Sequence, residues 1–551
     1  MPVADGFVTH TVENQPQPLC PYDAWSTDLP LREAVLREGA GWAEPELARF
    51  GPVAGGEMSV LGFLANENKP KLRLFDGMGR RLDEVEFHPA YHRLMEIGIE
   101  HGISSFGWRN AAKPGAHVAR GALFYLFGQP EQGVCCPLTM TNACVPALRN
   151  QPSLAEAWLP RITAHQYDGR VLPAWEKLGN TIGMGMTEKQ GGSDVRSNTT
   201  RATPLAKSGG GELYELVGHK WFFSAPMCDA FLVLAQTAAG ISCFLMPRFR
   251  PDGARNAIRI QRLKDKLGNW SNASSEVEFQ GAQAWLVGEE GRGVATILEM
   301  VALTRQDCIL GSAAIMRQAL VQSLHHTRHR KTFGRTLAAH ALMENVLADL
   351  ALESEATTAL MLRVARAVDG SSRDPKEAAF ARIATAIGKY WVCKRCAPFV
   401  NEAQESLGGI GYVEESILPR LYREAPLNSI WEGSGNIQCL DVLRAIGREP
   451  ESRHALFEEL VTTKGAHPAL DAVVRDIESA LADPSTLEQR SRAVVEKMAL
   501  AIQASLLVRA GHKEVSDIFC ETRLGGQHGL CFGTLPPHAP RKLLLERAFP
   551  A

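Results

Sequence analysis

The sequence predicts a multidomain α+β protein, and three observations support this. Its 551 residues are enough for several domains at ~150 residues each. Apolar residues repeat at a helical period in the first and last parts of the chain. Short alternating runs between glycine-rich turns occupy the middle. We therefore expect an N-terminal helical domain over 1–180, a middle antiparallel β domain over 181–290, a C-terminal four-helix bundle over 291–448 and an additional helical domain over 449–551.

Amphipathic stretches predict the helical domains. The first part contains DAWSTDLPLREAVLREG and HPAYHRLMEIGIEHGISSF, in which apolar residues recur close to every 3.6 positions. A later stretch carries an apolar stripe from Met343 to Val364, which is typical of the seam of a helix bundle. In the middle, SSEVEF alternates strictly and directs Val277 and Phe279 to one face, as in a half-buried strand.

Composition and charge narrow the function classes. The chain is 45% apolar and 22% charged, as ordinary globular proteins are, and no run of ~18 apolar residues predicts a membrane span. With 59 basic and 61 acidic residues it has no chain-wide basic footprint for nucleic acid. The first twenty residues contain no basic, apolar leader, so we expect a cytoplasmic protein. The 12 scattered cysteines predict neither a disulfide framework nor a metal site.

The polar stretch over 183–202, GMGMTEKQGGSDVRSNTTRA, combines hydroxyl groups with glycines. Glycine lets a backbone approach a ligand closely, and hydroxyl and N–H donors suit a polar ring or a phosphate. Its candidate ligand-binding residues are Met184, Thr187, Gly192 and Ser193. Taken alone, the stretch is more typical of a polar loop between domains.

Two further clusters follow along the chain. In GHKWFFSAPMCDAFLVLAQT, the candidates Phe222, Phe223 and Ser224 offer aromatic faces and a hydroxyl that suit a flat ring, although an ordinary strand core would look similar. In HRKTFGRTLAAH, Arg330 precedes the turn at Phe333 and could bind phosphate, although a solvated basic helix end is the simpler interpretation.

The fourth cluster, within 405–447, places a carboxylate beside an aromatic ring. Glu432 lies between Trp431 and Gly433, and Ile430, Ser434 and Asn436 are the other candidates. Apolar surroundings disfavour a charged carboxylate and raise its pKa toward that of a general base. A lone glutamate before a glycine is otherwise a surface residue.

Together the four clusters resemble the acyl-CoA dehydrogenase flavoproteins. The motifs M-T-E-x-x-G-G-S-D, K-W-F-F-S, R-K-T-F-G, G-G-I-G-Y and W-E-G-S-G-N-I-Q occur in the order of that family over about 40–448. The resemblance implies the acyl-CoA dehydrogenase-like arrangement of the domains given above. It also implies an oxidoreductase that binds FAD and acts on an acyl-CoA thioester, in a homotetramer.

The resemblance further assigns a role to each candidate. Glu432 takes the position of the base that abstracts the α-proton, while the β-hydride passes to FAD. Arg330 matches an arginine that holds the FAD of a neighbouring subunit. The remaining residues that the resemblance implies for FAD binding are Met184, Thr187, Gly192, Ser193, Phe222, Phe223, Ser224, Phe333, Ile430, Gly433, Ser434 and Asn436.

Other features point to one branch of that family. The stretches HTVENQPQPL, FDGMGRRLDEVEFHPAYH and RLKDKLGNWSNASSEVEF, and a tail of about 100 residues, are similar to adaptive-response flavoproteins. This similarity implies an alternative function: a DNA-associated flavoprotein that protects against alkylation damage and has weak or vestigial dehydrogenase activity. The tail, 449–551, would then contact double-stranded DNA. Thr304-Arg305 stand where some members place their base, so that second base is absent, and Ala341 replaces a usual flavin-contacting glutamine.

Overall fold

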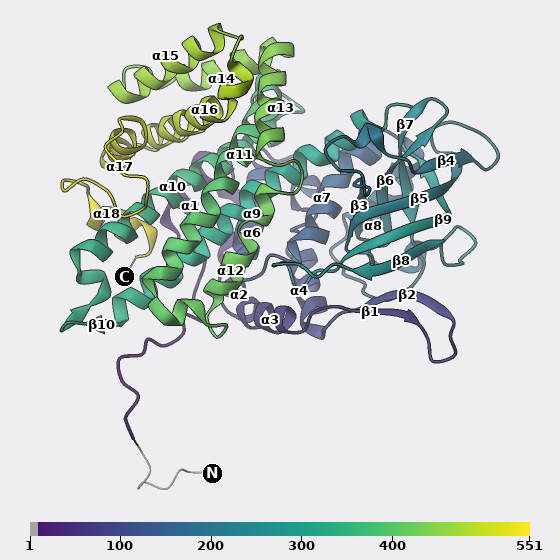
Figure 1. Cartoon of the computed structure of the whole chain (residues 1–551), viewed down its shortest axis with the longest axis horizontal. Coiled ribbons are helices and arrows are strands. Elements are labelled where there is room, and N and C mark those ends of the chain that lie inside the picture. The colour runs from purple at the N-terminus through teal and green to yellow at the C-terminus, as the bar shows by residue number, and fades with distance from the viewer. Residues whose placement is uncertain (1–8, 551) are drawn as a thin grey trace.

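The computed structural model describes residues 9–550 and sets a β-sheet beside a bundle of long helices (Figure 1). Helices and one hairpin form the N-terminal part, and their bounds are α1 Leu29–Arg37, α2 Glu44–Gly55, α3 Glu57–Glu67, β1 Lys71–Phe75, β2 Arg81–Glu86, α4 Pro89–Glu100, α5 Phe106–Arg109, α6 Ala116–Gly128, α7 Cys135–Arg149 and α8 Pro152–Ile162. Residues 1–8 of the predicted N-terminal domain lie outside the described part. The helices predicted there are confirmed, and the hairpin is an addition.

The β1–β2 hairpin was not predicted because its strands are short and mostly charged. The turn between them is built by Asp76, whose carboxylate accepts from the N–H groups of Met78 and Arg80, both at 2.8 Å. Gly79 has a φ of 79°, a left-handed conformation that glycine adopts at little cost. The two strands pair with Lys71 opposite Glu86.

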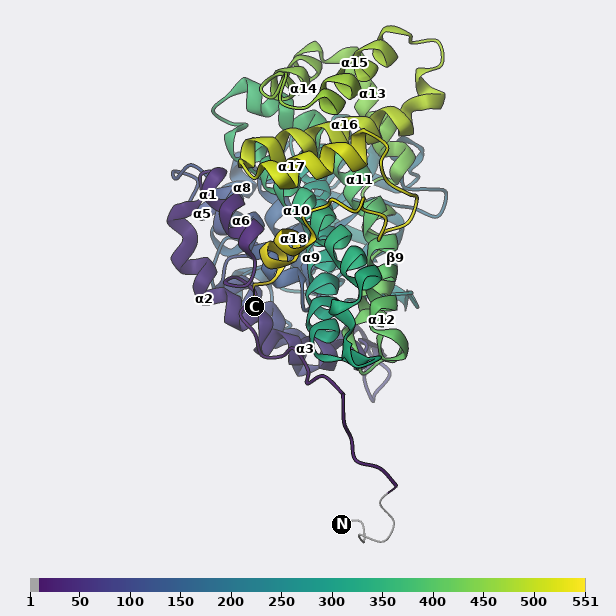
Figure 2. The ribbon, with the colours of Figure 1, turned by 90° about the vertical axis from the view of Figure 1, so that its left-hand side faces the viewer.

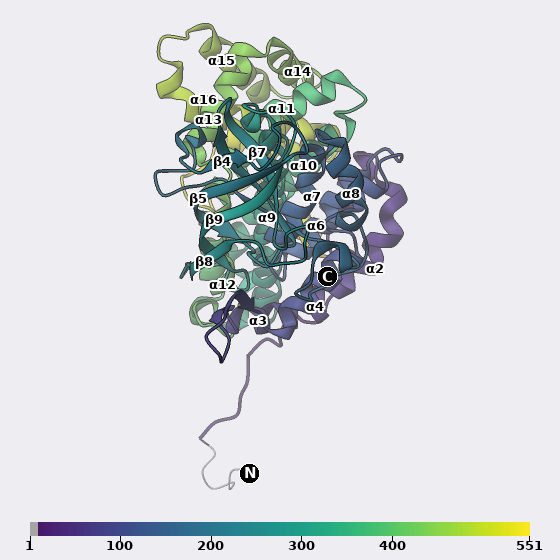
Figure 3. The ribbon, with the colours of Figure 1, turned by 90° about the vertical axis from the view of Figure 1, so that its right-hand side faces the viewer.

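The middle part forms a seven-stranded sheet that packs on α7 and α8 (Figure 3). Its strands are β3 Ile182–Gly185, β4 Arg201–Pro204, β5 Leu213–Ser224, β6 Ala230–Thr237, β7 Gly240–Pro247, β8 Ile258–Leu263 and β9 Ser274–Leu286. The order is β3-β6-β4-β5-β9-β7, with β8 on β9. The prediction of a wholly antiparallel sheet is wrong, because β6 pairs in parallel with β3 and β4. Alternation shows which faces are buried but not the direction of the neighbouring strand.

Three long helices and α13 form the bundle. The bounds are α9 Gly293–His329, α10 Ala341–Gly370, α11 Pro375–Ser406, α12 Ile417–Glu424 and α13 Gly435–Arg448, and the small hairpin β10 Lys331–Thr332 with β11 Arg335–Thr336 joins α9 to α10. Both α10 and α11 pack along α9, and α13 packs on α11. No helix within residues 9–550 is long and apolar enough to cross a bilayer.

The C-terminal tail folds back onto the bundle (Figure 2). Its helices are α14 Pro450–Val461, α15 Pro468–Ala482, α16 Leu487–Ala510, α17 Lys513–Phe519 and α18 Arg541–Ala548. Buried apolar residues of the tail belong to the same continuous core as those of the bundle and the N-terminal helices, while the sheet has a second core with α7 and α8. The tail is therefore packed as part of the helical body.

Arg317 on α9 ties the start of α1 and the end of α18 to the bundle. Its fully buried guanidinium forms an ion pair with Asp28 at 3.0 Å, donates to the carbonyl of Thr27 at 2.8 Å and donates to the carbonyl of Ala548. Asp28 also accepts from Tyr125 at 3.0 Å. A buried ion pair of this kind costs most when only one of its partners is removed.

We expect Asp28→Asn to destabilise the helical body by about 3–5 kcal/mol, because it leaves the Arg317 cation buried without a counter-charge. Asparagine keeps an oxygen for the N–H of Leu31, which Asp28 caps at 3.0 Å. The measurement is the first unfolding transition in urea. Asp374→Asn is the matched control, since Asp374 caps α11 in the same way but is exposed. Equal, small effects of both substitutions would refute a central role for the pair.

Candidate active site

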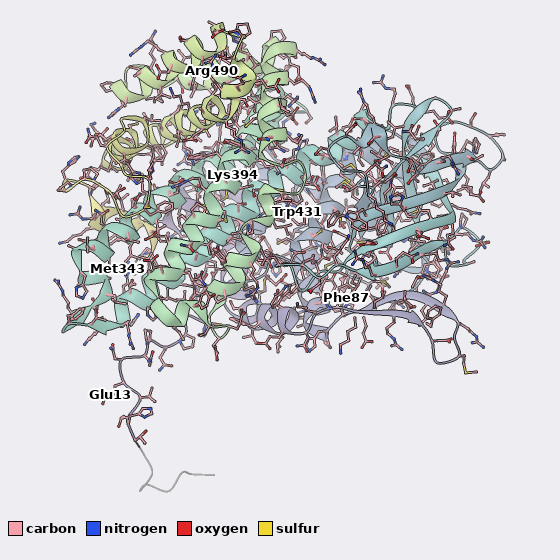
Figure 4. All side chains as sticks on the ribbon, viewed as in Figure 1. Glu13, Phe87, Met343, Lys394, Trp431 and Arg490 are labelled. Carbon is pink, nitrogen blue, oxygen red and sulfur yellow. The ribbon has the colours of Figure 1, made fainter. Side chains whose placement is uncertain are left out.

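The loop before α13 lies where the bundle meets the β domain, and Trp431 marks its position in Figure 4. The Trp431 ring packs against the apolar core of the β domain, and its indole N–H donates to the side chain of Asn428 at 2.9 Å. The packing of the Trp431 ring fixes the loop against the sheet, and the hydrogen bond to Asn428 fixes the ring within the loop. The neighbouring residue, Glu432, is thereby held at the border between the two parts of the protein.

The Glu432 carboxyl group is held by α9. The hydroxyl of Thr304 donates to Glu432 Oε2 at 2.8 Å. Arg305, the next residue, donates instead to the backbone carbonyl of Glu432 at 2.9 Å and forms an ion pair with Asp441 at 2.8 Å. The carboxylate therefore receives a neutral hydrogen bond, while the nearby cation is neutralised by another acid.

The backbone around Glu432 adopts a strained conformation that its neighbours maintain. Glu432 has a φ of 58°, and Gly433 follows with 94°. The carbonyl of Gly433 accepts from the buried ammonium of Lys389 at 2.8 Å and from the amide of Gln438 at 2.9 Å. A side chain on Gly433 would lie 2.7 Å from that amide nitrogen. A non-glycine residue with positive φ persists only where its surroundings enforce it, so this loop has a fixed shape.

Burial raises the pKa of Glu432 above its ordinary value. The Thr304 hydrogen bond opposes this rise, and the charges of Lys389 and Arg305 oppose it to a smaller extent. Desolvation is the largest effect because no cation touches the carboxylate directly. The result is a carboxylate that is a better proton acceptor than an exposed glutamate.

Hydroxyl groups of the β domain lie on the other side of this border. Met184 is half-buried in β3, and Thr187 follows that strand with its carbonyl fixed by the N–H of Trp221 at 2.8 Å. A Cβ on Gly192 would lie 2.4 Å from the Thr187 hydroxyl, so glycine is required at this close approach. Within residues 9–550, the hydroxyl groups of Thr187 and Ser193 donate no hydrogen bond. Both hydroxyls are therefore available as donors to a ligand.

Strand β5 presents one of its two phenylalanines and buries the other. The pairing of β5 with β9 is irregular between Lys220 and Phe223, which is a β-bulge. Phe222 is 50% exposed, while Phe223 is 0% exposed and packs on Phe231 at 4.3 Å between ring centroids. Ser224, half-buried, is the next residue. The predicted ligand contact of Phe223 therefore gains no support, because its ring belongs to the core.

The loop of Glu432 meets the β domain at one shared apolar core. Cys136 on α7 is a buried member of that core, and the Trp431 ring packs against it. Burial raises the pKa of the Cys136 thiol to about 11. Ile430, Ser434 and Asn436 are exposed on the same loop and on the first turn of α13.

Arg330 and Phe333 lie elsewhere in the protomer. Both follow the end of α9, and 26 residues of helix at 1.5 Å each separate Thr304 from Arg330, which is about 39 Å. Arg330 donates to the carbonyl of Asn14 at 2.6 Å, and Phe333 is 99% exposed at the tip of the hairpin. They cannot contact a ligand held by Glu432 of the same chain.

Four residues that hold the Glu432 loop were not predicted from the sequence. Three are buried polar residues inside otherwise apolar helices, and that is the signal that could have identified them. They are Thr304 on α9, Lys389 on α11 and Gln438 on α13. The fourth, Arg305, is adjacent to Thr304 and is partly exposed. An arginine that is partly exposed on a helix is ordinary, so nothing in the sequence singles it out.

A fifth contact, from the tail, was also not predicted. Arg492 on α16 donates to the side chain of Asn436 at 2.8 Å. The tail therefore touches the first turn of α13, where the loop of Glu432 ends. Contacts over 56 residues between two exposed side chains cannot be inferred from spacing along one helix.

Three family models match consecutive parts of the chain. They describe the adaptive response protein AidB N-terminal domain over 14–169, the acyl-CoA dehydrogenase middle domain over 183–282 and the acyl-CoA dehydrogenase C-terminal domain over 291–447. They confirm the predicted order of helical, β and helical parts.

Individual relatives agree with these models. The acyl-CoA dehydrogenase AidB of Escherichia coli (strain K12) is 49% identical over 95% of this chain and 96% of its own length. The crystal structure of Caenorhabditis elegans ACDH-11 in complex with C11-CoA matches with a TM-score of 0.84 and 27% identity, and covers 94% of this chain and 95% of that one. An acyl-CoA dehydrogenase complexed with FAD from Bacillus anthracis shares the fold, with a TM-score of 0.65 and 17% identity over 84% of this chain and 86% of that one.

These relatives confirm the family that the motifs predicted, an acyl-CoA dehydrogenase-like oxidoreductase. The similarity to AidB includes the N-terminal part and the tail, because it extends over 524 residues. The chain belongs to the acyl-CoA dehydrogenase family.

Proposed function

We propose that this protein is an FAD-dependent acyl-CoA dehydrogenase-like enzyme in which Glu432 removes the α-proton of an acyl-CoA thioester. The observation that carries the proposal is the half-buried Glu432 carboxylate, held by Thr304 and raised in pKa by burial. FAD, when bound, accepts the β-hydride. The structure of ACDH-11 in complex with C11-CoA supports an acyl-CoA as the class of substrate.

The residues on the β side suit FAD in chemistry. Thr187 and Ser193 supply free hydroxyl donors, and Gly191 leaves open space beside them, since a Cβ there would meet nothing within 4 Å. The half-exposed ring of Phe222 offers an apolar face for a flat ring system. Ser434 heads α13 without a side-chain cap, which leaves its hydroxyl available too.

Glu432 performs its proposed role through position and charge. An α-proton of a thioester is weakly acidic, so its removal requires a base close to Cα and an environment that excludes water. The Thr304 hydrogen bond orients the carboxylate, and the fixed backbone of Gly433 prevents the loop from swinging away. The partial burial of Glu432 reduces hydration of the carboxylate and strengthens it as a base.

A homotetramer is the assembly that we propose, in which Arg330 and Phe333 serve the FAD of a neighbouring subunit. Their distance from Glu432 in the same chain supports this. Phe333 and Leu342 are 99% and 85% exposed, and such large apolar groups beside a basic residue fit an interface better than free solvent.

The second function implied by the sequence, DNA association with protection against alkylation damage, receives less support from the tail. Seven of its twelve lysines and arginines are paired with a carboxylate within the chain. The ion pairs are Arg490–Asp483, Lys497–Asp476, Arg509–Glu459, Lys513–Asp517, Arg523–Asp349, Arg541–Glu344 and Arg547–Glu355. Phosphate contacts need cations that are free to replace counterions. Double-stranded DNA as a partner of 449–551 stays a prediction from the sequence.

We expect Glu432→Gln to retain FAD but to slow anaerobic bleaching of the flavin by an acyl-CoA by about 10²-fold or more, because glutamine keeps the shape and removes the base. Stopped-flow absorbance measures this rate. Glu424→Gln is the matched control, since Glu424 is a buried carboxylate with a pKa raised to about 7 that lies on α12, outside the site. An unchanged rate in the Glu432 variant would place the base elsewhere.

Thr304→Val should move the acidic limb of the bleaching rate to higher pH. The Thr304 hydroxyl stabilises the ionised carboxylate, so its removal raises the pKa of Glu432 further and less base is present below that pKa. Well above the pKa the rate should be unchanged. Thr304→Ser, which keeps the hydroxyl, should retain the wild-type profile. A parallel loss of rate at every pH would show a packing effect instead.

Arg330→Ala should lose FAD about tenfold or more readily and dissociate the assembly, since one side chain would serve both. Heat release with chromatography quantifies FAD, and size-exclusion chromatography with light scattering reports the assembly. Arg335→Ala, an exposed arginine on the same hairpin, is the control. Full FAD content in the Arg330 variant would argue against binding across subunits.

A further inference from the structure

A cavity lies outside the site of Glu432. Its volume is about 170 Å³, and it is lined by the end of β2, by α4, by residues within 167–177 and by residues of 225–228, which precede β6. Phe87, labelled in Figure 4, lies where the hairpin meets α4. Among the residues described over 9–550, none that we assign to FAD or proton transfer lines it.

One wall of the cavity is aromatic and apolar. The rings of Phe87 and Tyr91 stack with centroids 3.9 Å apart and an angle of 14° between their planes. Met95 and Met227 add flexible apolar surface. His92 and Tyr167 hydrogen-bond each other at 2.9 Å, which leaves them as a neutral pair. This wall can pack on a flat or branched apolar group of a ligand.

The opposite wall contains a buried arginine without an adequate partner. The side chain of Arg248 is only 10% exposed. Its guanidinium lies 3.9 Å from the Asp229 carboxylate and 3.6 Å from the sulfur of Met227, and Nε makes no hydrogen bond within the described residues. These are weak contacts for a group that carries five donors and a full charge.

Asp229 cannot compensate Arg248 because other groups already use it. Lys177 donates to one of its carboxylate oxygens at 2.6 Å, and the N–H of Thr181 donates to the other at 2.8 Å. Farther out, Arg255 and Glu84 neutralise each other. Lys177 and Arg248 thus share Asp229. The two other carboxylates that line the cavity, Asp168 and Glu86, are paired with Arg170 and Arg73.

We propose that this cavity binds a small monocarboxylate with an aromatic or branched apolar body. Its carboxylate would pair with the free edge of Arg248, and its body would pack on Phe87 and Tyr91. An arginine–carboxylate pair supplies the anion that the buried guanidinium lacks. A cavity of about 150 Å³ accommodates a benzene ring, so the size matches. The proposal is independent of the function proposed for Glu432.

Benzoate is the probe, titrated by calorimetry into the full-length protein as purified with its FAD. We expect binding by benzoate, and binding at least about tenfold weaker by benzamide, which has the same shape without the charge. Inorganic phosphate, an anion without an apolar body, should also bind at least about tenfold more weakly. Equal affinities for benzoate and either of these compounds, or no heat from benzoate up to about 10 mM, would overturn the proposal.

Three variants locate the binding site. Arg248→Gln should weaken benzoate binding about tenfold or more, whereas Arg250→Gln should not, since Arg250 is paired with Asp252 at 2.8 Å. Val171→Phe narrows the cavity without removing charge and should also weaken binding, which keeps the test decisive if the Arg248 variant fails to fold. Glu432→Gln should bind benzoate as the wild type does. A loss of binding in that variant would mean that benzoate occupies the acyl-CoA site, and the proposal would fail.

Discussion

The position of α9 is the constraint on which the rest of the structure depends. This one helix of 37 residues holds Thr304 and Arg305 at the Glu432 loop and Arg317 where the start of α1 meets the end of α18. It also places Asp307 against Arg120, a buried ion pair to which the hydroxyl of Thr139 donates at 2.8 Å. Because a helix has a fixed rise and rotation per residue, each contact restricts the others. A shift of one residue along α9 would displace its contacts with Glu432, with Asp28 and Ala548, and with the β10–β11 hairpin together.

Different polar groups around Glu432 hold the conformation of the loop and set the pKa of the carboxyl group. Arg305, Lys389 and Gln438 all donate to backbone carbonyls of Glu432 or Gly433, so they fix the strained conformation. Within residues 9–550, Thr304 alone donates a hydrogen bond to the carboxylate itself. If one of the two cations bound the carboxylate, it would lower the pKa and weaken the base. The arrangement keeps positive charge near enough to hold the loop but away from the group that takes the proton.

The sequence predicts most of the fold because periodicity reports burial directly. The sequence predicts the helical and β regions and the glycine-containing loops. It also indicates Glu432 as a candidate, because Trp431 is its neighbour. It cannot show that β6 runs parallel to β3, because strand direction depends on the path of the chain between them. Adjacent residues of a strand face opposite sides, so Phe222 is exposed while Phe223 lies in the core. Both rings were predicted as contacts because the resemblance assigns the whole K-W-F-F-S motif to the cofactor. The sequence marks Thr304 only as a position where a second base is absent, because nothing in the spacing of α9 shows that its hydroxyl reaches Glu432, 128 residues away.

The tail is part of the body that shapes the site. Its apolar residues share a core with the bundle, and Trp391 on α11 donates to Gln503 on α16 at 3.1 Å. Arg492 reaches from the same tail helix to Asn436, four residues beyond Glu432. Removal of the tail would uncover α10 and α11, the second of which carries Lys389. A truncated protein would therefore lose support for the Glu432 loop together with the tail surface. Substitution of single exposed residues of the tail separates the role of the tail surface from the support that the tail gives to the Glu432 loop. Such a substitution changes the surface and leaves the shared core intact.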